Sequence, residues 1–511
     1  MSPNAQLAVA AGRGPIVVLL LRLRGGTVYA FGTEACEIEQ RGIDTASIQV
    51  SPGLIVDEME SAIDPFALAG ETALTQAQVS IVLPESAAAM QGDWRYFGAA
   101  TAELARVWPG DVWRDREAML VGTRLSGVTL GIAGMPSSFT IEAARAKTSA
   151  VIGDASRTIG ADFPTPIDVA TNALTSLEGV EYPSVHGAPY RSAGFKIGQI
   201  GGDGYDRVVI AGHDFADLGT VTAYGDGASL GTFAVLNTTA TSGPYAYIRS
   251  NAAAFDNVAI TIAPARGGVA RVAGDAAALT FGDLLELWLN VSGLAVNWTK
   301  MRPTIERLRS WPGGVYLDTA TSAIEAIRDH LVSVAPLIEM QSAEGMWFYL
   351  ADFSTIQLRG VLTEGQELVG YVDGMQLTEA DDLVNSVTIR YSFDEFTGEY
   401  AASEVVGPDT DTVALVSDQM YGAYVADPIE SSAIKDASTA RRAGRSLIHR
   451  QATRRRVTTW LVSDTTDITP GEVYRVVSAT WGIDAPAVVT SIVGVVGRVV
   501  TFTVLDGPLA T

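Results

Sequence analysis

Histidines are the first residues to examine for acid–base or metal chemistry, because a neutral imidazole is a common metal ligand and titrates near neutral pH. His213-Asp214 follows the apolar run Val208–Ala211, so a catalytic or metal role is conceivable there. His330 stands beside Asp329 and is predicted to lie on the surface of a helix. The chain has four histidines, and none has a partner at the spacing of a metal-binding motif: His186, His213, His330 and His449.

Other motifs for catalysis are also weak. The single cysteine, Cys36, excludes an intrachain disulfide and any Cys-based zinc or iron–sulfur site. No G-x-S-x-G elbow occurs, and the glycine-rich run Gly198–Gly204 lacks the strand–turn–helix context of a phosphate loop. The carboxylate pairs Asp381-Asp382 and Asp394-Glu395 lie in turn-like sequence and are interpreted as solvated turns. The sequence therefore predicts no catalytic residue, metal or cofactor, and the chain is expected not to be an enzyme.

Basic residues are concentrated in one segment. Residues 433–456 hold eight of the 35 Lys and Arg residues and one acid, Asp436. A helix is predicted there, over 432–456, with Ser431 or Ser432 as its cap. Seven arginines are candidate interface residues: Arg441, Arg442, Arg445, Arg450, Arg454, Arg455 and Arg456. Docking on an acidic surface of a neighbouring protein is favoured over a merely solvated face, and DNA contact is the weaker alternative.

The overall composition is acidic and glycine-rich. A net charge of -23 argues against a protein that grips nucleic acid, since such binding needs Lys and Arg. Only 18% of the residues are charged and 51 are Gly, which suits many short strands and turns. No stretch approaches the ~20 apolar residues of a membrane helix. A soluble, mainly β protein with several domains is expected.

Strand patterns dominate both ends of the chain. Ile16–Leu23 and Thr27–Phe31 flank Gly25-Gly26 and predict a hairpin. Ala100–Val107 is predicted as a short helix. Near the other end, Ala487–Val496 and Val499–Leu505 are predicted strands. We expect β domains at 1–157 and at 381–511, the second interrupted by the basic helix.

The middle of the chain divides into two parts. Residues 158–275 are rich in Gly, Ala, Thr, Asp and Tyr and are predicted to form an inserted β module. Residues 276–380 are predicted as a small α+β segment. Within it, Ser322 and Glu325 form a capping box that begins a helix. Met346–Leu350 and Thr355–Leu358 are expected to pair as a hairpin.

A short motif occurs twice. Residues 109–114 read Pro-Gly-Asp-Val-Trp-Arg, and residues 470–475 read Pro-Gly-Glu-Val-Tyr-Arg. Pro-Gly makes a turn, the acid can accept from free amides, and Val with an aromatic residue can begin a strand. Common descent and convergent turn chemistry both explain the match. Under common descent, three chains would present six similar β domains in a ring.

On these features the sequence resembles the phage tail hub family of siphophages and gene transfer agents. Three patterns carry the resemblance, which covers the first and last 130 residues or so: the N-terminal hairpin with Ser51–Leu54, the run Asn385–Tyr391 before a Gly-Glu-Tyr turn, and the Ala- and Arg-rich helix leading to Pro470–Arg475. The resemblance implies a mainly β (α+β) fold with two hub-type β-barrel domains, and a homotrimer at the distal end of the virion tail, made in the host cytoplasm.

The resemblance also implies partners. These are a distal tail protein or tail tube ring, a tail fibre or spike, and the tape measure protein, with genomic DNA passing through without specific binding. The alternative is a glycan-binding or receptor-binding tail protein that acts through the module 158–275 on a host surface glycan. Its candidate stacking residues are six tyrosines: Tyr182, Tyr190, Tyr205, Tyr224, Tyr245 and Tyr247.

Overall fold

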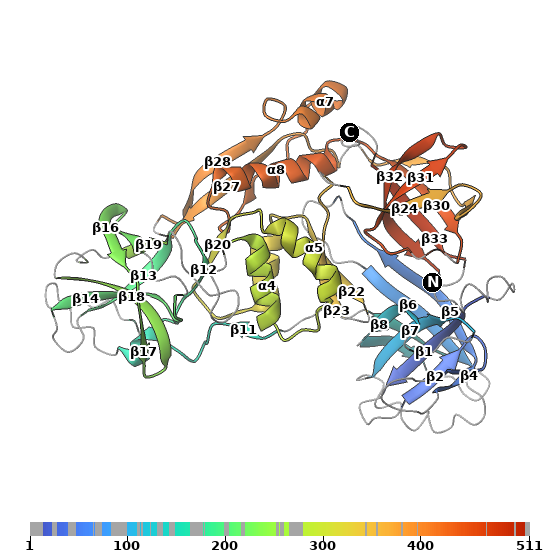
Figure 1. Ribbon diagram of the computed structural model, residues 1–511, viewed down its shortest axis with the longest axis horizontal. Helices are drawn as coiled ribbons and strands as arrows, with labels where there is room; N and C mark the ends of the chain where they lie inside the picture. Colours follow the sequence, from blue (N-terminus) through green and yellow to red (C-terminus); the bar gives the residue numbers. More distant parts are fainter. Residues whose placement is uncertain are drawn as a thin grey trace.

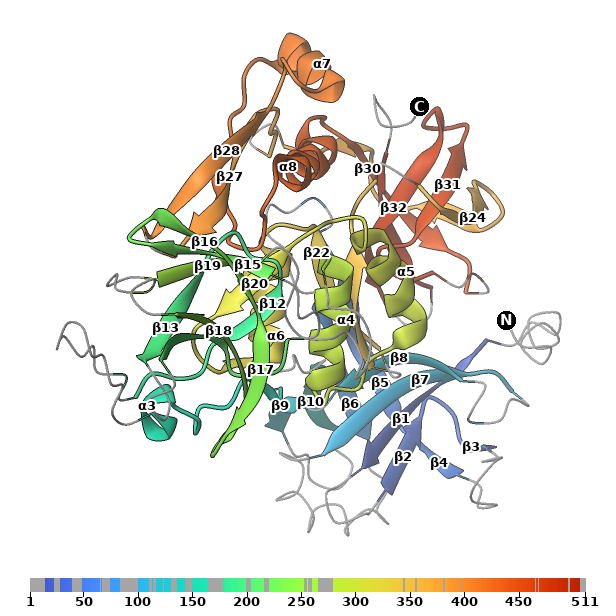
Figure 2. The ribbon, with the colours of Figure 1, turned by 60° about the vertical axis from the view of Figure 1, so that its left-hand side comes forward.

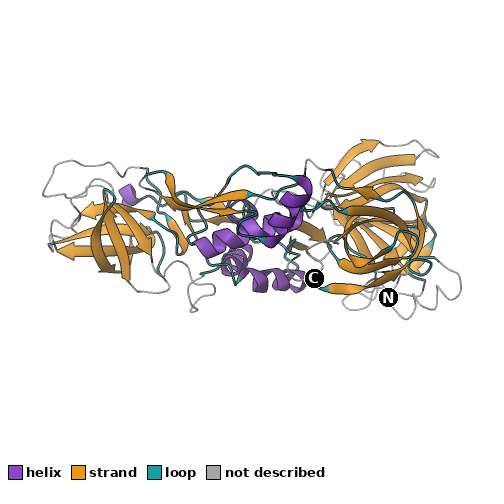
Figure 3. Ribbon diagram, turned by 90° about the horizontal axis from the view of Figure 1, so that it is seen from above, coloured by secondary structure: helices purple, strands orange, loops and turns teal. Residues whose placement is uncertain are grey.

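The computed structural model describes residues 14–505 apart from 23–27, 39–47, 65, 67–73, 83–99, 110–112, 114–115, 123, 130–135, 143–148, 164–176, 178, 199–203, 216–219, 252–254, 256–259, 265–278, 343–344, 354–355, 380–381, 396, 465, 467 and 495–496. The mainly β fold class is confirmed. Figure 1 shows a β module at one end, helices in the middle, and the N-terminal and C-terminal strands together at the other end. The view in Figure 3 shows the same order, with the helices between two groups of strands. No helix of the described residues is long and apolar enough to span a bilayer.

The N-terminal part consists of two sheets that share one apolar core. Its strands are β1 (Ile16–Arg22), β2 (Val28–Gly32), β3 (Cys36–Ile38), β4 (Ile48–Pro52), β5 (Leu54–Ala62), β6 (Leu74–Val82), β7 (Thr101–Val107), β8 (Glu117–Gly122), β9 (Arg124–Thr129) and β10 (Pro136–Glu142). The predicted hairpin is present as β1 and β2. The predicted helix at Ala100–Val107 is wrong: this segment is β7, which pairs along the whole of β1 and buries Ala102 and Leu104 in the core.

The C-terminal strands form a third group with its own core around Trp460 and Phe502. They are β24 (Leu358–Thr363), β25 (Leu368–Tyr371), β26 (Gln376–Leu377), β30 (Arg456–Val462), β31 (Val473–Ser478), β32 (Ile483–Val493) and β33 (Val499–Val504). The predicted hairpin of Met346–Leu350 with Thr355–Leu358 is wrong, because β24 pairs with β31 instead. Strands that the sequence placed in the 276–380 segment therefore complete the C-terminal sheet.

The two ends of the chain meet in one sheet. Strand β32 pairs with β5 through Ser491↔Ala62 and Val493↔Glu60. The result is a path of strands in the order β25-β30-β33-β32-β5-β6-β10-β9, within a sheet of 11 strands. Among the described strands no sheet closes on itself, so the closed barrels implied by the resemblance are not present within one chain.

The inserted module is a seven-stranded sheet. Its strands are β13 (Ser192–Gly198), β14 (Tyr205–Ala211), β15 (Thr220–Gly225), β16 (Ala228–Ala234), β17 (Leu236–Ala240), β18 (Gly243–Asn251) and β19 (Ile260–Pro264), and the short helix α3 (Ile159–Asp162) precedes them. Strand β12 (Ser184–Gly187) pairs with β20 (Gly314–Leu317), and β11 (Val151–Ile152) pairs with β21 (Thr321–Ser322). These two small ladders connect the module to the helical centre.

The helical centre holds the largest apolar core. It contains α4 (Phe281–Val291), α5 (Trp298–Leu308), α6 (Ala323–Ile327), a π-helical turn η4 (Arg328–Val332), and the hairpin β22 (Leu337–Ser342) and β23 (Gly345–Leu350). The predicted cap is present: Ser322 Oγ accepts from the Glu325 N–H at 3.3 Å. Helix α4 is buried along most of its length because Trp288 and its apolar neighbours face the core.

A hairpin with two helices packs against this centre. It consists of β27 (Val387–Asp394), β28 (Glu399–Val406), α7 (Thr412–Tyr421), the short strand β29 (Ile429–Glu430) and the basic helix α8 (Ala437–Gln451). Figure 2 shows α7 at the end of this hairpin. The predicted caps Ser431 and Ser432 are wrong, because Asp436 Oδ1 accepts from the N–H groups of Ser438 and Thr439, each at 2.9 Å. Helix α8 therefore begins several residues later than predicted.

The two copies of the repeated motif differ in structure. Pro470 and Gly471 form a turn, Gly471 has a φ of 87°, and β31 begins at Val473. In the first copy, Trp113 lies in a 3₁₀ turn and the next strand begins only at Glu117. Residues 110–112 and 114 lie outside the described residues. Trp113 therefore precedes its strand by several residues, whereas Tyr474 lies within β31.

Candidate functional site

Three of the seven candidate arginines lie together on the exposed face of α8. Arg441 forms an ion pair with Glu404 at 2.7 Å. Arg445 lies 3.4 Å from Asp411. Arg442 donates to Ser310 Oγ at 2.6 Å and to the Ser310 carbonyl, and among the described residues it has no ion pair. The structure therefore brings together Arg441, Arg442 and Arg445, and it leaves Arg442 as a cation with neutral partners.

The other four arginines lie at or beyond the end of the helix, and two of them bind its last carbonyls. Arg455 is buried and donates to the carbonyls of His449 and Arg450, where α8 ends. Burial lowers the pKa of Arg450 to about 10. Cations at the carboxyl end of a helix satisfy its last carbonyls and complement its dipole. Arg450 and Arg455 are thus corrected from docking residues to structural ones. Arg454 donates to the Thr378 carbonyl at 2.7 Å, and Arg456 begins β30.

Helix α5 separates two connected cavities. A cavity of about 670 Å³ lies on the α8 side and includes the three exposed arginines and His449 in its lining. A second cavity of about 700 Å³ lies on the β24 side and is lined by Trp347, Tyr349 and Leu358, among others. Both are lined by Glu306, Arg307 and Asp352, so the two cavities are adjacent along α5, and together they are here called the α5 groove.

The charges in this groove are mostly paired. Arg307 Nη2 lies 2.8 Å from Asp352 Oδ2 at the point where the two cavities meet. Burial opposes ionisation of Asp411, yet hydrogen bonds from His449 and from the N–H groups at the start of α7 outweigh it, so the pKa of Asp411 is lowered. Arg445 and His449 therefore face a stable carboxylate, whereas Arg442 and Lys300 line the groove without an ion pair among the described residues.

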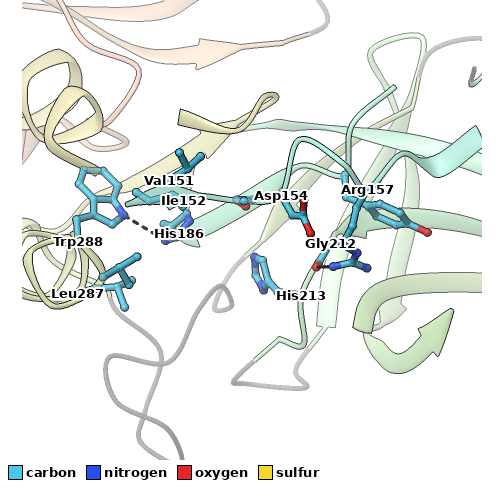
Figure 4. A pocket seen from close by; sticks show the side chains of 13 residues that line it. Val151, Ile152, Asp154, Arg157, His186, Gly212, His213, Leu287 and Trp288 are labelled. Carbon is cyan, nitrogen blue, oxygen red and sulfur yellow. Dashed lines mark hydrogen bonds between the residues drawn. The ribbon is translucent and has the colours of Figure 1, made fainter. Parts of the chain in front are cut away.

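Two of the remaining histidines meet at a smaller cavity of about 220 Å³, between the inserted module and α4. Figure 4 shows His186 between Trp288 and His213. Trp288 Nε1 donates to His186 Nδ1 at 3.4 Å. His213 Nε2 accepts from the Val185 N–H at 3.1 Å, so its Nδ1 donates to the Asp214 carbonyl at 3.0 Å. Both nitrogens of His213 therefore have backbone partners, whereas His186 uses Nδ1 alone, and its buried Nε2 has no hydrogen-bond partner among the described residues.

Burial keeps these histidines neutral. It lowers the pKa of His186 to about 3, with smaller contributions from His213 and His330. Burial also lowers the pKa of His213 and of His330. The predicted surface position of His330 is wrong: its ring is half-buried and lies 6.4 Å from the ring of Trp288. In the described residues no group of three or more His, Cys, Asp or Glu could hold a metal ion.

The tyrosines of the inserted module are packing residues. Each of the six is buried or half-buried, which leaves little ring surface for a sugar. Arginine guanidinium groups lie over five of these rings: Tyr182, Tyr190, Tyr205, Tyr224 and Tyr247. Tyr245 contacts Tyr182 and Phe163. We find no exposed aromatic platform among these six tyrosines.

The paired carboxylates do not form a catalytic couple. Asp394 forms an ion pair of 2.7 Å with Arg191, which ties β27 to the start of the inserted module. Burial, with Asp318 and Asp394 nearby, raises the pKa of Glu395 to about 7. Asp381 lies outside the described residues, and Asp382 is exposed. The interpretation of Asp394 as part of a solvated turn is wrong, since it is buried and paired.

The joined sheet has a polar face that sequence reasoning missed. On this face, cross-strand neighbours form one row of Glu58, Gln78, Thr140 and Ser126, and another of Ala62, Ser491, Thr501 and Thr459. The opposite face carries the two apolar cores. Polar residues at positions 76, 78 and 80 alternate with apolar ones, and this alternation indicated a polar face on β6. Only the pairing of β32 with β5 joins that face to the polar face of the C-terminal strands.

Comparisons with known proteins give structural neighbours only. No family model matches the chain, and no curated protein matches it. Among similar solved structures, the 43 kDa tail protein of prophage MuSo2 from Shewanella oneidensis has 9% identity and a TM-score of 0.40, covering 98% of this chain and 100% of that one. A prophage tail protein from Listeria monocytogenes has 10% identity and a TM-score of 0.27, covering 63% and 94%.

A third neighbour is a tail protein from Neisseria meningitidis, with 12% identity and a TM-score of 0.30 over 64% of this chain and 97% of that one. The three neighbours are thus named as tail proteins, two of them of prophages, which agrees with the resemblance stated from the sequence. At TM-scores this low, these likenesses carry no argument for what the chain does.

Proposed function

We propose that this chain is a structural virion protein, a baseplate or tail-tip hub subunit that closes the phage tail tube and joins it to fibre or spike proteins. The observation that carries the proposal is the joined sheet, in which β32 near the carboxyl end pairs with β5 near the amino end. One chain thereby supplies a continuous run of eight strands, β25-β30-β33-β32-β5-β6-β10-β9. Such a run is suited to be one segment of a larger ring.

The two ends of this run are open edges. Among the described strands, β9 pairs only with β10, and β25 pairs only with β30. Exposed edge strands pair readily with another chain. Val369 on β25 and Leu377 on β26 are 58% and 52% exposed, which is unusual for large apolar side chains on an edge. Pairing of β25 in one copy with β9 in the next is a head-to-tail contact, which closes into a ring at a fixed rotation.

The polar face of the joined sheet suits the inside of such a ring. Its two rows contain small or amide side chains and Glu58, and no Lys or Arg occurs in them. Cross-strand contacts such as Ser80 Oγ to Asp57 at 2.5 Å keep some of its polar groups paired. DNA adheres to proteins through Lys and Arg. A lumen lined in this way would let DNA pass without holding it.

The partners of this proposal are those that the resemblance implies. A homotrimer would stack on a distal tail protein or tail tube ring on one side and on a fibre or spike on the other, with the tape measure protein ending in its lumen. Its place would be the distal end of the tail.

The test is the mass of the full-length chain in solution, with negative-stain images of the particles. We expect a trimer, about three times 53.8 kDa, that forms a ring with a central opening. Val369→Lys with Leu377→Lys should give a folded monomer, because charges on an edge strand oppose pairing. Val405→Lys is the matched control, since Val405 is 55% exposed on β28, away from both edges. A wild-type chain that stays monomeric at every concentration would contradict the proposal.

A further inference from the structure

The α5 groove offers a long surface with two chemically different ends. Its floor includes Lys300, Pro303, Thr304 and Arg307, which follow each other at the spacing of one helix face. One end lies against α8 and the other against β24 and the turn at Pro470-Gly471. Each cavity has the size of an ordinary ligand site, and together they exceed it. An extended chain fits this shape better than a compact small molecule does.

The α8 end is suited to carboxylates. Arg441 and Arg445 are 46% and 48% exposed even though each has an acidic partner. Arg442 lies between them along the helix, and its guanidinium is 5.9 Å from the Trp311 ring; within the described part of the chain its hydrogen-bond partners are the Ser310 oxygens. A guanidinium binds a carboxylate more strongly than it binds neutral oxygens. An incoming carboxylate would therefore find an available partner at Arg442.

The β24 end is more apolar, although the ion pair of Arg359 with Glu472 also lines it, and it has a free strand edge. Leu358 is 50% exposed although it lines a concave surface, and Trp347 and Tyr349 lie in the same lining. Lys300 lies over the Trp347 ring at 4.4 Å, which fixes the ring at the wall of the groove. In the described residues β24 pairs with β31 alone. A bound segment could add to this edge as a strand while an apolar side chain covers Leu358.

We infer that the α5 groove binds an extended acidic segment of a neighbouring tail protein, with its carboxylates at Arg442 and an aliphatic or aromatic side chain against Leu358. This inference rests on the proposed function for the identity of the neighbour. Nucleic acid is the poorer occupant, because Glu306 and Asp352 line the groove and the chain carries a net charge of -23. A protein segment uses both the cationic end and the apolar end.

The experiment measures fluorescence anisotropy of a labelled synthetic peptide with the full-length chain. The peptide carries Trp and Leu at one end and a run of Glu at the other, and a second peptide has Lys in place of each Glu. We expect the Glu peptide to bind and the Lys peptide to fail. Arg442→Glu should weaken binding about tenfold, since an attractive pair becomes a repulsive one. Leu358→Lys should weaken it by a similar factor, through lost apolar burial.

Arg390→Glu is the matched control for charge. Arg390 is 49% exposed on β27 with an acidic partner, Glu430, and it does not line the groove. This variant should bind the Glu peptide like the wild type. The mass of the Arg442→Glu chain separates the two proposals, because Arg442 lies on α8 and not on the edge strands β9 and β25. Equal affinity of the Arg442→Glu and wild-type chains, or no binding by a chain that still forms trimers, would overturn the groove and leave the hub standing.

Discussion

Acid should open the junction between the inserted module and the helical centre, because His186 is buried there as a neutral ring. His186 lies on β12, which pairs with β20, and Trp288 of α4 donates to it. His213 and His330 face it from the inserted module and from η4, and Asp154 and Arg157 line the same cavity. A proton on His186 would therefore enter a site with two more imidazoles and little solvent.

The magnitude follows from the pKa values. The pKa of His186 is about 3 in the folded chain and 6.5 as its ordinary value, so the unfolded or opened state binds the proton first as the pH falls. Stability is thus fully present above pH 6.5 and declines below it, down to the folded pKa. At pH 5 the loss is about 2 kcal/mol from this residue alone, or roughly thirtyfold in the opening equilibrium. His213 and His330 act in the same direction, since burial also lowers the pKa of each.

Hydrogen exchange measured by mass spectrometry reports this opening locally. Protection of the amides in β12 and β20, corrected for the intrinsic rate, should fall about tenfold per pH unit between pH 6 and pH 4. His186→Gln should flatten this slope even if it lowers protection at every pH. His449→Gln changes a histidine that pairs with Asp411 outside the junction, and it should leave the slope unchanged. A slope in the His186→Gln chain equal to that of the wild type would refute the reasoning.

Two further substitutions test the backbone assignments. Gly471→Ala should destabilise the C-terminal strands by about 1–2 kcal/mol, because Gly471 has a φ of 87° that residues with a side chain rarely adopt. Urea unfolding measures this loss of stability. Gly360→Ala is the control and should change stability little, because the added Cβ would meet only ordinary contacts. Asp436→Ala should cost about 1 kcal/mol through loss of the α8 cap, whereas Ser432→Ala should cost much less; equal losses in thermal unfolding would mean that the cap is misassigned.

Local patterns were sufficient for much of the secondary structure. The hairpin at the amino end and the box that begins α6 are present where alternation, turn residues and capping residues predicted them. Each of these depends on residues close together in the chain. Ala100–Val107 was predicted wrongly because its small residues fit either state, and only pairing with β1 selects a strand.

The candidate site shows the same limit. Its concentration of arginines was visible in the sequence. Which of them are exposed depends on where α8 ends and on what packs beneath it: Arg441, Arg442 and Arg445 are exposed, whereas Arg450 and Arg455 are buried. The composition alone determined that the chain is acidic, mainly β, and without a cysteine-based metal site. The tertiary structure decided that β32 meets β5, since this pairing joins strands hundreds of residues apart, each with its own apolar core, and leaves no local trace in the sequence.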